Sequence, residues 1–305
     1  MRIVFQIVVI LCVLVAFGAA KLRFEDNLNQ EMVEERLIQP SLKEGTSLQL
    51  GQTGAAVALG GLRSLVAAMW NLRAFVHFEN LDWIKLEESY EVITTLQPQT
   101  THYWETGAWH LHTNASVHYN ENQDLSPIRR QALRKLYIDK GSAFLEEGVR
   151  QNPQNWKLHL GLARLWSDRF KLPDFSRAVN HYDNVLATDT IPDYKISQYK
   201  RFRFYSLTRI PERQREALED GTALFRSTPN NHLPNLVCCL FALQNAVQLP
   251  ENERIPDNEL FPDEKTQYVW LSNYWQNRRI AFPMDGVEEK RQELQAKLGT
   301  PRPGR

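Results

Sequence analysis

The chain has 305 residues, of which 43% are apolar and 24% charged, and this length is enough for a sizeable hydrophobic core. Basic and acidic residues balance at 36 each, so no net basic field attracts nucleic acid or a phosphate-rich ligand. Composition therefore indicates a globular protein and disfavours a nucleic-acid partner.

The N-terminus is a candidate membrane segment. Residues Ile3–Ala20 are almost entirely apolar and follow Arg2. Their length lies at the boundary between a signal peptide and a spanning helix. Gly18 and Ala20 would permit cleavage after Ala20, which would leave a secreted or periplasmic protein, but the run is long for the apolar part of a signal peptide. We therefore expect an uncleaved anchor at residues 1–20, with the body outside the cytoplasm because Arg2 is the cytoplasmic charge.

Residues 21–61 are expected to lead from this anchor to the main body. Lys21–Leu50 is charged and is predicted to form a juxtamembrane stalk. Gly51–Gly61 contains four glycines but lacks the Gly-Lys-Ser/Thr ending of a phosphate-binding loop. We expect these glycines to allow close helix packing where the helical region begins.

Residues Phe144–Trp166 predict two helices separated by a tight turn. Pro153 cannot continue the first helix, and Asn155 is a good N-cap for the second. A short connection makes the two helices antiparallel, and a single pair cannot bury its apolar faces alone. The same steps of four, three and five residues occur in three places: Leu86, Tyr90, Ile93 and Pro98; Gly141, Leu145, Gly148 and Pro153; and Ala217, Gly221, Leu224 and Pro229.

This pattern resembles the tetratricopeptide repeat, a helix–turn–helix unit of 34 residues, and Trp70 and Trp104 are separated by that period. Gly60–Ala74, Thr94–Pro98 and Trp104–Val117 further resemble a group of bacterial membrane-anchored proteins with such repeats. The resemblance implies an all-α fold, a right-handed α-solenoid of divergent repeats over residues 62–249. Residues 250–305 are then a loop, capping helices and a disordered tail. The resemblance also implies a location at the bacterial inner membrane, with the body in the periplasm.

The spacing of the repeats departs from 34 residues at three insertions. The largest is expected as a loop at Ala115–Ser126, and smaller ones are expected near Lys171–Pro173 and Thr188–Asp193. If the protein were an enzyme, the inserted loop would have to carry the chemistry, and its only candidates are His118, Tyr119 and Asp124. We expect no catalytic activity.

Neither the cysteines nor the histidines form a metal-binding pattern. Cys238 and Cys239 are adjacent in an apolar helix and are predicted to be buried free thiols. His110 and His112 would point about 200° apart on an α-helix, so they cannot bind one ion from the same face. We therefore predict no metal and no cofactor.

The repeat resemblance implies a concave wall made by the first helix of each pair. Its positions here are Asn71, Phe75, His102, Glu105, Trp109, His112, Arg164 and Asp168. Our leading hypothesis is a membrane-anchored scaffold that binds a protein of the cell envelope on this wall. The alternative is a binding module for a small molecule or glycan, in an aromatic pocket near Trp104 and Trp109.

Overall fold

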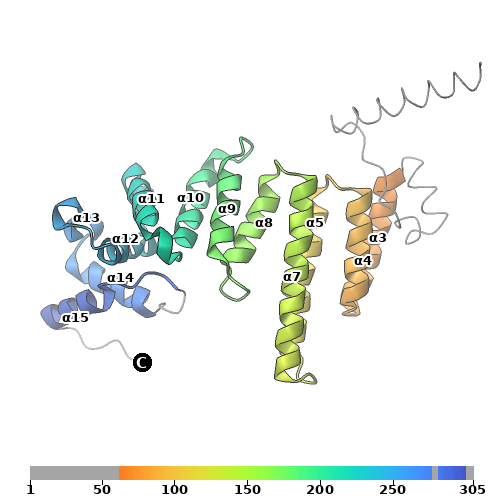
Figure 1. The fold of residues 1–305 in the computed structure, drawn as a ribbon, viewed down its shortest axis with the longest axis horizontal. Helices are drawn as coiled ribbons and strands as arrows, with labels where there is room; N and C mark the ends of the chain where they lie inside the picture. Colours follow the sequence, from red (N-terminus) through yellow and green to blue (C-terminus); the bar gives the residue numbers. More distant parts are fainter. Residues whose placement is uncertain (1–61, 277–280, 300–305) are drawn as a thin grey trace, which may run out of the picture. The chain divides into compact units, whose positions relative to one another are not determined.

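The structure is a computed structural model, and it describes residues 62–276 and 281–299. The predicted anchor, stalk, glycine-rich stretch and C-terminal tail from Pro301 lie outside these ranges. Every regular element within them is a helix, which confirms the all-α prediction (Figure 1). None of these described helices combines the length and the apolar character needed to cross a bilayer.

The chain divides into two compact units between Thr100 and Thr101. In the first unit, the structure describes α3 (Arg63–Glu79) and α4 (Trp83–Leu96), which pack against each other. The carboxylate of Asp82 accepts a hydrogen bond from the backbone N–H of Lys85 at 3.2 Å and so caps α4.

The second unit contains the remaining described helices, most of which pack against their neighbours in the chain (Figure 1). In order they are α5 (Thr101–Trp109), η2 (His110–Ala115), α6 (Ser116–Glu121), α7 (Pro127–Gln151), α8 (Trp156–Ser167), α9 (Phe175–Leu186), α10 (Asp193–Leu207), η3 (Pro211–Arg213), α11 (Gln214–Ser227), η4 (Pro229–Asn231), α12 (Pro234–Ala246), η5 (Glu251–Glu253), α13 (Asp257–Leu260), α14 (Glu264–Gln276) and α15 (Val287–Leu298).

Helix ends fall where the sequence predicts them. Pro98, Pro153 and Pro229 each lie two residues beyond the end of a helix. The side chain of Asn155 accepts a hydrogen bond from the backbone N–H of Lys157 at 3.1 Å, so its predicted role as an N-cap is confirmed. The two smaller predicted insertions coincide with the connections between α8 and α9 and between α9 and α10.

The expectation of an inserted loop at Ala115–Ser126 is wrong. The helix that begins with α5 continues through a π-helical segment, η2, into α6, and the chain turns only at residues 122–126. The insertion is therefore largely helical. Helix α7 is correspondingly long, with 25 residues, and packs along the whole of the α5–η2–α6 helix.

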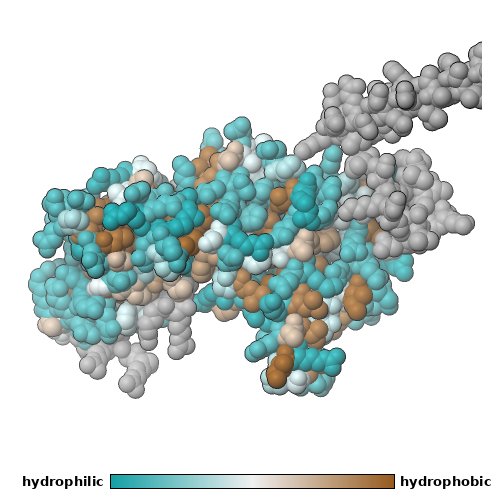
Figure 2. Space-filling model, in the orientation of Figure 1, coloured by the Kyte–Doolittle hydropathy of each residue, from teal (hydrophilic) through white to brown (hydrophobic). Residues whose placement is uncertain are grey.

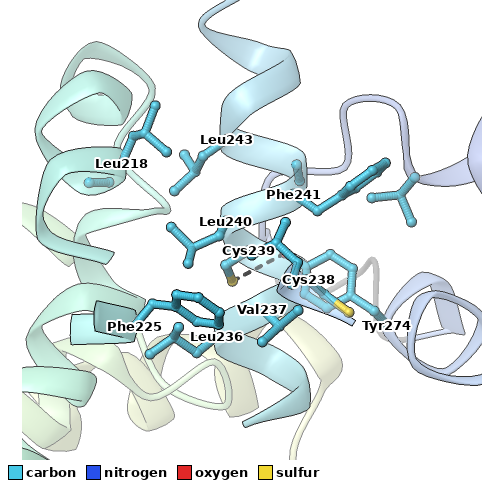
Figure 3. Packing of buried hydrophobic residues seen from close by; sticks show 14 of the residues in the cluster. Leu218, Phe225, Leu236, Val237, Cys238, Cys239, Leu240, Phe241, Leu243 and Tyr274 are labelled. Carbon is cyan, nitrogen blue, oxygen red and sulfur yellow. Dashed lines mark hydrogen bonds between the residues drawn. The ribbon is translucent and has the colours of Figure 1, made fainter. Parts of the chain in front are cut away.

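The largest hydrophobic core surrounds α12 (Figure 3). Both Cys238 and Cys239 are fully buried free thiols, as predicted. The Cys239 sulfur lies 3.3 Å from the hydroxyl of Tyr274, which donates to the carbonyl of Pro283 at 2.9 Å. A second core lies between α5, α7, α8 and α9 and includes Trp104 and Trp166.

Candidate partner-binding face

Two tryptophans of α5 have opposite environments. Trp104 is 3% exposed, and its ring packs on Phe144 at a centroid distance of 5.0 Å and against the backbone of Gly148. Trp109, at the end of the same helix, is 49% exposed, and its ring lies 5.1 Å from that of His110. One face of α5 is therefore part of the core, and Trp109 extends beyond it to the surface.

Charged side chains from α5 and α8 lie near one another in the second unit. Burial raises the pKa of Glu105, while the positive charges of Lys157, His102 and Arg164 act in the opposite direction. Because α8 packs beside α5, Arg164 and Lys157 lie within electrostatic range of Glu105. The structure thus brings together three residues of the predicted wall: His102, Glu105 and Arg164.

Two other predicted wall residues of this unit make local contacts that support the loop after α8. The Nδ1 atom of His112 lies 2.8 Å from the ammonium group of Lys171. Burial, followed by the charge of Lys171, lowers the pKa of His112 to about 3, so this imidazole is neutral. The carboxylate of Asp168 accepts a hydrogen bond from the backbone N–H of Phe170 at 2.9 Å.

The last two predicted wall residues belong to the first unit. Asn71 lies on α3, where its side-chain oxygen is 3.5 Å from the hydroxyl of Tyr90. Phe75 lies on the same helix and is exposed. That these two residues share a surface with the wall residues on α5 and α8 stays a prediction.

The residues considered for catalysis form aromatic contacts. Tyr119 stacks on Tyr137 with ring centroids 5.1 Å apart, and His118 meets the ring of Tyr119 edge-on at the same distance. Asp124 lies exposed in the turn between α6 and α7. Among the described residues, no three side chains of the metal-ligating types come together.

Sequence reasoning missed a cavity of about 640 Å³ between the C-terminal end of α9 and one face each of α10 and α11. Leu186, Ile196 and Leu224 supply its apolar lining, and the exposed Lys200 lies at its edge. The guanidinium of Arg203 crosses one end and forms ion pairs with Asp183, Glu216 and Asp220. The sequence shows that the lining residues of α10 share one helix face. It does not show that α11 packs opposite this face and closes the cavity.

The site and fold define an all-α protein with a mixed aromatic and charged surface. No known protein family matches this chain, and a search of curated proteins also found no match.

Proposed function

We propose that this protein is a scaffold that binds a protein partner through the α5–α8 face, defined by His102, Glu105, Trp109, Lys157 and Arg164. The exposed Trp109 is the observation that carries this proposal. Tryptophan and arginine are the residue types that most often dominate binding energy at protein interfaces. The half-buried carboxylate of Glu105 lies one helical turn before the exposed indole, and the exposed Lys157 and Arg164 lie within electrostatic range of that carboxylate. An apolar anchor with polar residues beside it is typical of an interface.

The finer architecture is also a proposal. We assign the helix pairs to a right-handed solenoid of tetratricopeptide-like repeats, because successive helices of the second unit pack chiefly on their neighbours in the chain. In this proposal, residues 1–20 anchor the body at the periplasmic side of a bacterial inner membrane. The partner is then another protein of the cell envelope, and the protein has no catalytic activity.

One observation favours the alternative of a small-molecule or glycan-binding module. The cavity between α10 and α11 has the volume of a ligand pocket, for which the usual range is about 300–1,000 Å³. Of the two tryptophans first considered for such a pocket, Trp104 is buried in the core, so only Trp109 has surface to offer a ligand. In this alternative a small ligand would bind in the cavity, because the buried Trp104 cannot form an aromatic pocket together with Trp109.

Affinity purification of the full chain from gently solubilised native membranes, after crosslinking, tests the scaffold. Trp109→Ala and Arg164→Ala should each lose a stoichiometric protein partner that the wild type retains. Tyr194→Ala is the matched control, because Tyr194 is an aromatic residue on α10 that is 79% exposed but lies outside the α5–α8 face. A partner that survives both substitutions, or the absence of any partner from the wild type, would contradict the proposal.

A further inference from the structure

The first unit has an exposed apolar seam along α3. Leu62, which caps this helix, is followed at steps of three, four, three and four residues by Leu65, Met69, Leu72 and Val76. These five side chains are each between 49% and 70% exposed. Large apolar side chains that gather in this way on a surface usually mark an interaction site.

The opposite side of α3 is already occupied. Val66, Ala67 and Ala74 are buried, and α4 is the helix that packs against α3. Helix α3 therefore has two apolar faces, and its pairing with α4 buries only one of them. The side chains of the second face are all exposed.

The spacing of the seam specifies what fits on it. Alternating steps of three and four residues give a period of 3.5, which places side chains in a narrow line that interdigitates with a second helix. A helix that faces a broad core has a wider stripe. The seam is thus suited to one more α-helix, and α3 provides about 25 Å of length for this contact.

We infer that the seam binds the same seam of a second copy of this chain, with the two α3 helices antiparallel. In this register Leu65 packs against Val76 of the second copy, and Met69 packs against Leu72 of the second copy. The layers made by Leu65, Met69, Leu72 and Val76 then each contain two apolar side chains, and Leu62 lies at the end of the contact, opposite Glu79 of the second copy. The arrangement is two-fold symmetric and closed, as in most homodimers.

Charge at the ends of α3 supports a second copy and fixes the direction. Arg63 is at the N-terminal end and the exposed Glu79 at the C-terminal end. Antiparallel packing brings the Arg63 end of each copy to the Glu79 end of the other. Parallel packing would instead bring Glu79, which follows Val76 at the next step of three, next to its own counterpart, and like charges in close contact disfavour association.

The mass of the full chain in mild detergent tests this inference, which does not depend on the α5–α8 face. The wild type should have twice the mass of one chain. Leu72→Asp should weaken association by more than about 100-fold, because each dimer would bury two unpaired carboxylates. The control is Ile128→Asp on α7, because Ile128 is an apolar residue outside the seam that is 83% exposed. Apolar residues also reach the surface at several other places on the face shown in Figure 2. This control should remain dimeric.

A cysteine pair tests the direction. In a Cys12→Ser background the remaining cysteines, Cys238 and Cys239, are fully buried. Copies with Leu65→Cys should form a disulfide with copies carrying Val76→Cys, and neither variant should crosslink to itself. Self-crosslinking of Leu65→Cys would indicate parallel packing and overturn the inference. A monomeric wild type, or a Leu72→Asp variant that stays dimeric, would also overturn it and leave the lipid surface or the upstream chain as the occupant of the seam.

Discussion

The ammonium group of Lys171 donates hydrogen bonds to both the main-chain carbonyl and the Nδ1 atom of His112. It also contacts the hydroxyl of Thr113 at 2.8 Å. Lys171 lies in the loop between α8 and α9, whereas His112 lies in the π-helical segment η2. In this segment the backbone N–H of Ser116 bonds to the carbonyl of Leu111, five residues earlier. One lysine therefore holds the loop against the irregular part of the helix.

Removing this amine should destabilise the second unit. We expect Lys171→Met to lower the free energy of unfolding by about 1–3 kcal/mol, because acceptors in a partly buried place lose their donor. Denaturant unfolding measures the change. Lys200→Met is the matched control, since Lys200 is an exposed lysine, and its effect should be within about 0.5 kcal/mol. Equal effects of the two substitutions would show that the contacts of Lys171 contribute no net stability.

A pair of histidines should make the protein sensitive to acid. The Nε2 atom of His159 is 3.1 Å from the carbonyl of Pro153, to which it donates, so its Nδ1 accepts from the Nδ1–H of His181 at 3.3 Å. Burial, with smaller contributions from His159 and Arg177, lowers the pKa of His181 to about 4. Between pH 4 and 6.5 the unfolded chain binds more protons at this residue, so stability falls as the pH is lowered through that window.

The size of this effect is bounded by one proton, or about 1.4 kcal/mol per pH unit. His181→Gln should therefore lose less stability than the wild type between pH 6.5 and pH 4, as measured by urea unfolding at several pH values. Asn180→Gln should keep the slope of the wild type, because it replaces an exposed, non-titrating residue beside His181 on α9 and leaves every titratable group in place. A His181→Gln variant with an unchanged slope would refute the assignment.

Two glycines should respond to alanine in opposite directions. A Cβ atom at Gly221 would lie 2.5 Å from the ring of Phe204, so Gly221→Ala should destabilise the protein by about 1–3 kcal/mol. At Gly161, in the interior of α8, the nearest atoms belong to Leu145 at an ordinary 3.5 Å. Gly161→Ala should therefore stabilise the protein by about 0.5–1 kcal/mol, because alanine is the better helix former. Thermal unfolding of both variants provides the measurement, and a shift of the same sign in each would contradict this explanation.

Features set by neighbouring residues could be predicted from the sequence, and features set by distant ones could not. Pro153 and Asn155 define a helix end and a helix start by their own chemistry. The π-helical segment has no such local signature, because its contacts include Lys171, which is 59 residues away from His112. Trp104 and Trp109 likewise differ only in tertiary environment. The cavity beside α10 exists because α11 packs against α10, and tertiary packing determines this pairing of helices.

The position of α12 has a consequence for the order in which the fold opens. Nine consecutive residues, Leu236–Gln244, are buried, so this part of the helix is enclosed on all sides (Figure 3). The helices around it, such as α11 and α14, each have exposed residues. Transient opening of an outer helix exposes little of α12, and its amides exchange with solvent only when several neighbours have separated together. The amides of α12 should therefore be the most strongly protected from hydrogen exchange in the second unit. Partial unfolding should begin at outer helices, which can detach while α12 stays packed.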